Sequence, residues 1–384
     1  MTVTIDTLQT MDDLKDIRGK RVLVRVDYNV PLGDNGIVDD DEAWRIKKSF
    51  ATINELRDKG ARIILISHIG RDPEETLQPV VDYINEHIGY AVGFIPVIQG
   101  DVVDEAIRRL GDGHVILLEN VRSNPGEKGN DKDFAEKLAS YADIYINDAF
   151  SVSHRAHASV VGIPALLPAY AGRQLEDEVR HLSVVDNPAH PYVVMLGGAK
   201  FGTKLTLLEQ EIATADTVIV GGALAHTIYK ARGLEIGKSL VDDEVDVSSY
   251  ADNEKLWVPD TVLVQHDDDS VEEVAIEQVQ TTDTIVDIAP SACETIAPII
   301  KHAQTILWNG PFGWYEKGFT TGTDILFDMV GENTGTTVLG GGDTVTVLLE
   351  SGKVDNFIFV STAGGAMLDY VVDGTLVGLK PLLK

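Results

Sequence analysis

Short apolar runs rich in Val, Ile and Leu recur along the chain and alternate with longer amphipathic segments. Short, nearly continuous apolar runs are typical of strands buried on both faces, and their alternation with helices predicts a parallel sheet. In the first half the runs lie at 22–26, 63–66, 115–118 and 144–146, and the helical patterns at 42–58, 76–88 and 131–140.

The second half repeats this alternation. Its apolar runs lie at 192–196, 217–220, 284–288, 305–307, 336–339 and 357–360, between helical segments such as 204–213 and 343–350. We therefore expect an α/β protein with two doubly wound, parallel-sheet (Rossmann-like) domains joined by a helix and a hinge. Residues 173–185 have helical character and no strand, so they are predicted to connect a first domain at 1–172 to a second at 186–367.

Composition narrows the class of protein. The chain has 384 residues, of which 44% are hydrophobic, and a formal net charge of −29. That length supports two buried cores, while the negative charge argues against nucleic-acid and anionic-membrane partners. The single Cys293 forms no internal disulfide, which favours a reducing compartment. With neither a secretion signal nor an apolar run of 18 residues, we expect a cytoplasmic protein without a membrane span.

The acidic residues gather in runs at 39–42, 242–244 and 267–269. Such runs are usually solvated surface rather than metal clusters, because a metal site needs a particular spacing of ligands. Self-repulsion of this size opposes compaction unless salt screens it. The hypothesis that follows is a chain adapted to high salt, whose stability rises with KCl.

Basic residues are unevenly distributed. Thirteen of the 14 arginines lie at or before Arg180. Arg binds carboxylates and phosphates through its planar fork, and open α/β sheets bind ligands at the carboxyl ends of their strands. For any one Arg a surface ion pair is the simpler interpretation, but several strand ends together favour a ligand site. The candidates at these ends are Asp27, Asn29, His68, Arg71, Arg122 and Arg155.

Strands of the second half end in glycine instead. Glycine lets backbone N–H groups approach a phosphate, and the helix that follows adds its dipole. Tight strand-to-helix packing is the alternative for any one pair, whereas five such ends in one domain favour a nucleotide. Asp343 suits a magnesium-bound phosphate, because Mg²⁺ prefers oxygen ligands. The glycine-rich ends lie at 197–204, 221–225, 308–316, 340–344 and 361–366.

Two other patterns do not support a site. Residues 233–239, GLEIGKS, resemble a phosphate-binding loop, but three residues separate the glycines where four are required. His154 and His157 lack further ligands at a suitable spacing, so a contact at a helix start is a simpler interpretation than a metal pair. No GxGxxG follows the early strands, which weakens a dehydrogenase interpretation.

The motifs RVLVRVDYNVP, SHIGR, LLENVR, NDAFSVSHRAH, LGGAKFGTK, WNGPFGWYE, GGGDT and STAGGA, in this order from Arg21 to Ala366, resemble the signature of the phosphoglycerate kinases. The resemblance covers nearly the whole chain. It implies a two-domain, magnesium-dependent kinase that transfers a phosphoryl group reversibly between 1,3-bisphosphoglycerate and ADP, giving 3-phosphoglycerate and ATP. It places the triose on the first domain and the nucleotide on the second.

The resemblance also implies a role for each matching residue. Asp27 and Asn29 would hold the hydroxyl and carboxyl end of the triose, and Arg45 and Lys200 would gather charge on the transferring phosphoryl group as catalytic residues. The phosphate and carboxylate of the triose would be bound by Arg45, His68, Arg71, Arg122 and Arg155. The nucleotide would be bound by Gly197, Gly198, Lys204, Asn309, Glu316, Gly341, Gly342, Asp343 and Thr344, with Asp343 also on Mg²⁺.

The family pattern further implies closure of the two domains and a C-terminal segment, 368–384, that returns to the first domain. We expect a monomer. The chain departs from the pattern at Ala289 and Ala363, where glycine is usual, and at Tyr28, where phenylalanine is usual. The loop after Arg71 is also shortened and lacks basic residues.

Two other functions are considered beside this one. A kinase for a different carboxylate would share the nucleotide half but not the basic edge. A two-domain solute-binding protein could share the hinge and the arginines, but it would need an export signal and would have no use for Asp343 or Glu316. Catalytic turnover distinguishes a kinase from a solute-binding protein.

Overall fold

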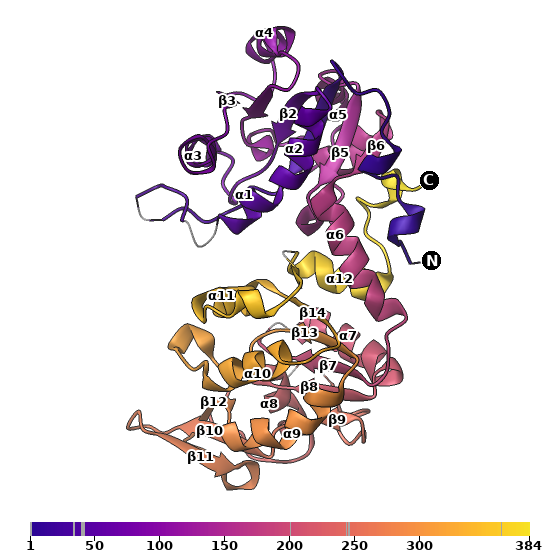
Figure 1. Ribbon diagram of the computed structural model, residues 1–384. Helices are drawn as coiled ribbons and strands as arrows, with labels where there is room; N and C mark the ends of the chain where they lie inside the picture. Colours follow the sequence, from indigo (N-terminus) through magenta and orange to yellow (C-terminus); the bar gives the residue numbers. More distant parts are fainter. Residues whose placement is uncertain are drawn as a thin grey trace. The chain divides into compact units, whose positions relative to one another are not determined.

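The computed structural model describes residues 2–33, 35–39, 43–199, 201–242, 244, 246–361 and 363–384. The chain divides into two compact units, Met1–Ser183 with Asp373–Lys384, and Val184–Val372 (Figure 1). Each unit contains a six-stranded parallel sheet flanked by helices. The prediction of an α/β fold with two parallel sheets is therefore confirmed. None of the helices in the described ranges has the length and apolar character needed to cross a membrane.

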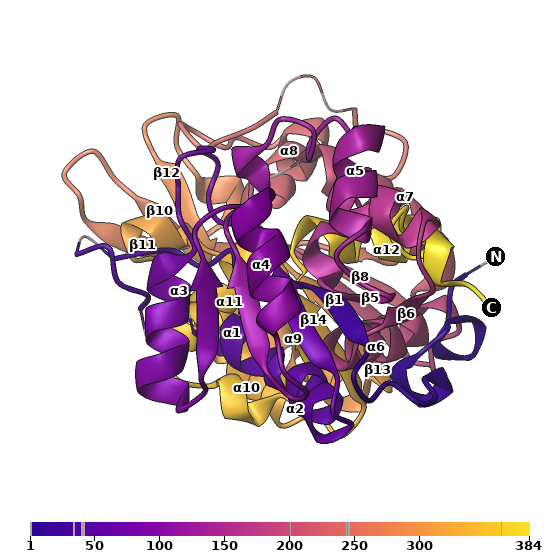
Figure 2. The ribbon, with the colours of Figure 1, turned by 90° about the horizontal axis from the view of Figure 1, so that it is seen from above.

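The first sheet has the strand order β3-β4-β2-β1-β5-β6, and every neighbouring pair is parallel. Neighbouring strands such as β1, β5 and β6 can be followed in Figure 2. From β1 the chain moves first to one side of the sheet and later to the other, which makes the carboxyl ends around β1 the expected ligand edge. The strands are β1 Arg21–Val26, β2 Arg62–Ile66, β3 Val92–Ile95, β4 Val115–Leu118, β5 Ile144–Asp148 and β6 Ala169–Ala171.

Helices of the first unit bury their apolar faces against this sheet. One continuous core joins strand residues such as Val24 and Ile63 to helix residues such as Ile53 and Leu56, all of them fully buried. The predicted helix at 42–58 forms as two helices that meet at Ser49. The helices are α1 Trp44–Lys48, α2 Phe50–Asp58, α3 Gln78–Tyr83, α4 Asp101–Arg109, α5 Lys132–Ala139 and α6 Arg173–Leu182.

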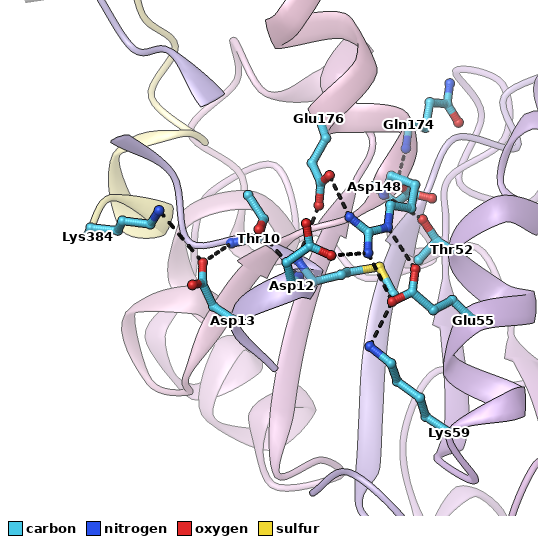
Figure 3. A network of polar contacts seen from close by, with 12 residues as sticks. Thr10, Asp12, Asp13, Thr52, Glu55, Lys59, Asp148, Gln174, Glu176 and Lys384 are labelled. Atoms are coloured by element: carbon cyan, nitrogen blue, oxygen red, sulfur yellow. Dashed lines mark hydrogen bonds and ion pairs between the residues drawn. The ribbon is translucent and has the colours of Figure 1, made fainter. Parts of the chain in front are cut away.

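Arg173 ties the start of α6 to the first unit. Its guanidinium lies 2.7 Å from Glu55 Oε2, 2.7 Å from Asp12 Oδ1 and 2.8 Å from Glu176 Oε2 (Figure 3). Hydrogen bonds to these carboxylates, Glu55 first, raise the pKa of Arg173, and Arg173 in turn lowers the pKa of Asp12 and of Glu55, because each charge stabilises the charged form of its partner. The first turn of α6 is thereby held to α2 and to the N-terminal segment.

The C-terminal segment also belongs to the first unit. The backbone N–H of Lys384 donates to Thr7 O at 3.0 Å, and that of Gln9 donates to Leu382 O at 2.8 Å. Further back, the Gly378 N–H donates to Ser153 O at 2.8 Å, close to the carboxyl end of β5. The last residues are thus hydrogen-bonded to both the N-terminal segment and the loop after β5.

The second sheet has the order β15-β14-β13-β7-β8-β9 and is again parallel throughout. Its order reverses between β7 and β13, which places an expected ligand edge at their carboxyl ends. The strands are β7 Tyr192–Leu196, β8 Thr217–Val220, β9 Leu256–Trp257, β13 Thr305–Asn309, β14 Thr336–Gly340 and β15 Val360–Ser361. The helices are α7 Phe201–Thr214, α8 Gly222–Ala231, α9 Pro290–His302, α10 Thr321–Gly331, α11 Gly342–Glu350 and α12 Gly365–Asp373.

Two predicted strands differ from the structure. The run at 284–288 forms β12 Thr284–Ile288, but this strand pairs antiparallel with β10 Thr261–Gln265 in a separate three-stranded sheet completed by β11 Val271–Ala275. Of the run at 357–360, only Val360 belongs to a strand. Phe357 and Phe359 are buried while Ile358 is 98% exposed. This run is apolar because its aromatic side chains fill the core, not because it lies in the middle of a sheet.

Candidate functional site

Polar side chains meet at the carboxyl edge of the first sheet. Asp27 directly follows β1 and is 2% exposed. Its carboxylate accepts hydrogen bonds from Ser151 Oγ at 2.7 Å and from Arg45 Nη1 at 3.3 Å. Asn29 Oδ1 accepts from the backbone N–H of Gly70 at 2.8 Å, which joins the loop after β1 to the loop after β2. The end of β1 is therefore linked to α1 and to the ends of β2 and β5.

Arg45 reaches this edge from α1. Its side chain is 21% exposed, and Asp27 is its ion-pair partner among the described residues. The Arg45 Nε atom is buried without a hydrogen-bond partner in that part of the chain. A guanidinium offers five N–H donors in a planar fork, and within the described ranges Asp27 accepts from one of them, so the others can bind an anionic ligand.

His68 follows β2 and is 3% exposed. Its Nδ1 lies 2.9 Å from Arg25 Nη2, and because an arginine can only donate, the imidazole accepts there and carries its proton on Nε2. Burial, followed by the charges of Arg25, Arg122 and Arg155, lowers the pKa of His68 far below its usual range. His68 is therefore a neutral N–H donor at this edge, not a cation.

The other predicted basic residues lie around the same edge. Arg122, in the short helix after β4, is 8% exposed and donates to Gly70 O at 2.6 Å. Arg155, in the loop after β5, is exposed and donates to His154 at 3.1 Å. Arg71 is exposed, with no hydrogen bond or ion pair to a described residue. The structure thus joins Arg122 to the loop after β2 and leaves the guanidinium groups of Arg71 and Arg155 accessible.

Arg25 and Glu127 are buried charges that sequence reasoning missed. Arg25 lies inside β1, is 1% exposed, and donates to Ser159 Oγ at 3.1 Å as well as to His68. Glu127 is 1% exposed and accepts from Ser159 N at 2.9 Å and from Ser159 Oγ at 2.5 Å. Burial lowers the pKa of Arg25, and Glu127 supplies the main opposing charge. The position of Arg25 inside an apolar strand was the one feature of the sequence that could have indicated this buried charge.

His157 is close to this pair. Its Nδ1 lies 3.7 Å from Glu127 Oε1, but burial and the charges of Arg122 and Arg155 lower its pKa to about 4, so the ring is neutral at pH 7. The sequence favoured a contact at a helix start over a metal pair for His154 and His157. Within the described ranges, no group of three or more His, Cys, Asp and Glu side chains could hold a metal ion.

The second unit contains a cavity of about 490 Å³ at the carboxyl edge of its sheet. Its lining comes from the loops after β7, β8 and β13, from α8, from strands β10 and β12, and from the start of α11. Gly198, Glu316 and Asp343, three of the predicted nucleotide-binding residues, are part of this lining. The volume and the mostly apolar walls are typical of a small-molecule site.

Two glycines show how closely the loops around the cavity pack. Gly222 has φ +58°, and a Cβ there would lie 2.6 Å from the backbone N of Gly198. Gly310 has φ +97°, and a Cβ there would lie 2.2 Å from Gly197 O. Both positions require glycine for packing and for backbone conformation. For these two, the tight-packing interpretation from the sequence is correct.

Several predicted residues lie directly behind the cavity wall. Lys204 is 3% exposed and donates to Gly197 O, and its Nζ would lie 2.9 Å from a Cβ on Gly198. Asn309 is 3% exposed and donates to Gly340 O at 3.1 Å. Thr344 is fully buried, and its Oγ1 accepts from the Gly310 N–H at 2.7 Å. Asn309 and Thr344 both pack beneath Gly341.

Asp343 has the surroundings that a magnesium ion needs. It lies in the first turn of α11, half-buried, and its Oδ1 accepts from Tyr315 Oη at 3.4 Å. Glu316 contributes a second carboxylate to the same cavity. Mg²⁺ typically uses one or two protein carboxylates together with substrate phosphates and waters, so the Asp343 carboxylate fits this ion. Lys200, predicted as catalytic, lies outside the described residues.

Asp287 and His226 also line the cavity and were not predicted from the sequence. Asp287 is 3% exposed and accepts from the backbone N–H groups of Gly322 and Ile288, both at 2.9 Å. Burial raises the pKa of Asp287 to about 7. Ala289 and Ala363 are buried and are not part of the lining, so their methyl groups do not narrow the cavity.

A cationic edge on one parallel sheet and a glycine-bounded cavity on another are the features of a two-domain α/β kinase. Comparison with known proteins gives the family. The phosphoglycerate kinase family model matches residues 11–373. The phosphoglycerate kinases of Sphingopyxis alaskensis and Coprothermobacter proteolyticus are each 39% identical to this chain. The first match covers 97% of this chain and 98% of its relative, and the second covers 96% and 97%.

Solved structures agree with these relatives. The phosphoglycerate kinase of Coxiella burnetii superimposes with a TM-score of 0.84 at 34% identity, over 98% of both chains. That of Pyrococcus horikoshii gives 0.85 at 26% identity, again over 98% of both chains. This chain belongs to the phosphoglycerate kinase family. It is a kinase, a phosphoryl transferase of glycolysis with ATP or ADP as co-substrate.

Proposed function

We propose that this chain catalyses reversible, magnesium-dependent transfer of a phosphoryl group between 1,3-bisphosphoglycerate and ADP, giving 3-phosphoglycerate and ATP. The observation that carries the proposal is that one unit has a cationic sheet edge and the other has a glycine-bounded cavity of small-molecule size. Membership of the phosphoglycerate kinase family supports the same reaction.

In this proposal the first unit binds the triose. Asp27 and Asn29 bind its hydroxyl and carboxyl end, and the guanidinium groups of Arg71, Arg122 and Arg155 bind its phosphate and carboxylate. His68 acts as a neutral N–H donor, consistent with its lowered pKa. Arg45 has unpaired donors beside Asp27 and binds the oxygens of the phosphoryl group in transit. Phosphoryl transfer needs positioning and charge stabilisation more than covalent help from the protein, so no side-chain nucleophile is required.

The second unit binds the nucleotide. Gly197, Gly198 and Lys204 receive its phosphates, and Lys200 shares the charge of the transferring group. Glu316 binds the ribose, and Asn309 supports the phosphate region. The turn formed by Gly341, Gly342, Asp343 and Thr344 presents the N-terminus of α11 to the phosphates. When bound at Asp343, Mg²⁺ neutralises phosphate charge.

Because the two ligands bind to different units, transfer requires the units to bring them together and to exclude water. We propose 1–172 as the triose domain and 186–367 as the nucleotide domain. Residues 173–185 act as the connecting helix, and residues 368–384 act as the segment that returns to the first domain. The hydrogen bonds of Gly378 and Lys384 within the first unit support the last assignment.

Replacing Gly342 by alanine tests the turn at α11. A Cβ at Gly342 would meet no atom within 4 Å, and its backbone needs no positive φ, so we expect unchanged or slightly higher stability. A methyl group at this N-terminus would obstruct a bound phosphate, and we expect the KM for ATP to rise about tenfold. Steady-state kinetics and thermal unfolding measure the two effects. Gly129→Ala, at a position in the first unit with ordinary contacts, is the control. Equal KM values for ATP in the two variants would show that the turn at α11 does not contact the nucleotide.

We also infer a salt-adapted, monomeric, cytoplasmic enzyme without a membrane or nucleic-acid partner. The net charge of −29 supports the salt adaptation, since salt shortens the range of the self-repulsion from about 10 Å at 0.1 M to about 3 Å at 1 M. We expect the midpoint of thermal unfolding to rise as KCl is raised toward molar levels. Maximal stability in dilute buffer would contradict the adaptation.

The deciding experiment is ATP-dependent phosphorylation of 3-phosphoglycerate, measured in a coupled assay at low and at molar KCl. We expect turnover that increases with salt and is lost on addition of EDTA. Turnover at low salt alone would support the kinase function and contradict the salt adaptation. A folded protein that turns over a different carboxylate but not 3-phosphoglycerate would identify another carboxylate kinase.

A further inference from the structure

His226 is a buried polar residue in the wall of the cavity, and the roles proposed above do not use it. It lies in α8, four residues after Gly222, and is 7% exposed. A rise of about 1.5 Å per residue places it about one helical turn away from the N-terminus of α8 that borders Gly198. The imidazole is therefore set back from the glycine loops that would hold phosphates.

The proton on His226 is fixed by one hydrogen bond. Its Nδ1 lies 2.9 Å from the carbonyl oxygen of Leu240. A carbonyl can only accept, so Nδ1 carries the proton and Nε2 presents a lone pair. Burial lowers the pKa of His226 to about 4, which keeps the ring neutral near pH 7. Within the described ranges Nε2 has no hydrogen-bond partner.

The wall around this lone pair is mostly apolar. Leu240 follows Ser239, whose Oγ accepts from the backbone N–H of Ile285 at 2.8 Å, so the two cavity-lining residues Leu240 and Ile285 belong to adjoining segments. Pro259 and Val262 also line the cavity. Apolar side chains beside the Nε2 acceptor suit a flat heterocycle that carries a hydrogen-bond donor at its edge.

We propose that His226 selects the nucleobase, its Nε2 accepting a hydrogen bond from the exocyclic amino group at C6 of a purine. This inference rests on the proposed nucleotide site and deepens it. A purine without that amino group would leave Nε2 unpaired in an apolar wall, which costs more than the hydrogen bond alone. A site built to hydrogen-bond a substrate rejects the analogue that lacks the partner more strongly than a purely apolar pocket does.

The first test needs no variant. The kcat/KM of the intact protein is measured with ATP and with purine riboside 5′-triphosphate, which carries hydrogen in place of the amino group. We expect ATP to be preferred by at least about tenfold. Equal kcat/KM values would overturn the role of His226 and leave the kinase function intact, whereas a folded protein inactive with both nucleotides would overturn the proposed function itself.

Two substitutions separate the two nitrogens of His226. His226→Asn places an amide near Nδ1, so it keeps the hydrogen bond to Leu240 and loses the lone pair in the cavity. His226→Gln places an amide oxygen near Nε2 and retains an acceptor. We expect His226→Asn to bring the ratio of kcat/KM values close to one, chiefly by raising the KM for ATP, and His226→Gln to retain most of the preference.

Thermal unfolding and the KM for 3-phosphoglycerate distinguish selection from a structural role. A variant that is merely damaged loses activity with both nucleotides alike and leaves their ratio unchanged. An unchanged ratio in His226→Asn, with folding and the KM for 3-phosphoglycerate retained, would overturn the proposal.

Discussion

Arg45→Ala is expected to lower kcat for phosphorylation of 3-phosphoglycerate by about a thousandfold, with a change of less than about threefold in KM. The physical reason is the state of the guanidinium. Asp27 at 3.3 Å is its ion-pair partner in the described structure, and Nε is buried without a partner. Donors that are already desolvated and unpaired gain most from the charge that develops on a phosphoryl group in transit, because water does not compete for them.

Two further variants make the result specific to the guanidinium. Lys47→Ala removes a cation from the same helix, but its side chain is exposed, so we expect kcat within about twofold of the parent protein. Arg45→Lys keeps the charge and loses the planar fork, and we expect partial recovery. Steady-state kinetics with saturating ATP measures kcat and the KM for 3-phosphoglycerate separately in each variant. A change confined to the KM for 3-phosphoglycerate would make Arg45 a binding residue and not a catalytic one.

The strands that could be predicted contain a run of buried side chains that are mostly apolar. β4 and β7 are buried at every position and coincide with apolar runs. β3 was missed because Gly93 and the partly exposed Phe94 and Ile95 interrupt its apolar pattern. β11 exposes most of its residues and has no apolar run. Pairing direction was not predictable either: β12 is as apolar as a parallel strand, yet it pairs antiparallel with β10.

The candidate site could be predicted where position along a strand was enough. Asp27 and His68 were predicted as candidates because ligand residues of parallel sheets follow the strands, and the structure places both at that edge. Arg25 and His226 were missed because each belongs to the interior of an element. Whether such a residue is a buried structural charge or a ligand contact depends on partners far along the chain. Ser159 lies 134 residues from Arg25, and Leu240 lies 14 residues from His226.

Glu127→Ala is expected to lower the free energy of unfolding by about 3–5 kcal/mol, because it leaves a buried cation without its counter-charge. Arg25 is 1% exposed, and Glu127 is the main charge that favours its protonated form. The substitution also leaves the hydroxyl and N–H of Ser159 without their acceptor. Chemical denaturation at pH 7 measures the loss, and Glu136→Ala, at a half-exposed carboxylate on α5, should cost less than about 0.5 kcal/mol.

Glu127→Gln separates charge from hydrogen bonding. The amide can still accept from Ser159 through its oxygen but carries no charge, so a loss intermediate between those of the parent protein and Glu127→Ala is expected if the negative charge of Glu127 stabilises Arg25. Since Arg25 also holds His68 at 2.9 Å, both variants should raise the KM for 3-phosphoglycerate more than the KM for ATP. A loss below about 1 kcal/mol in Glu127→Ala would mean that Arg25 finds other compensation, and the buried pair would then not be what supports the triose-binding edge.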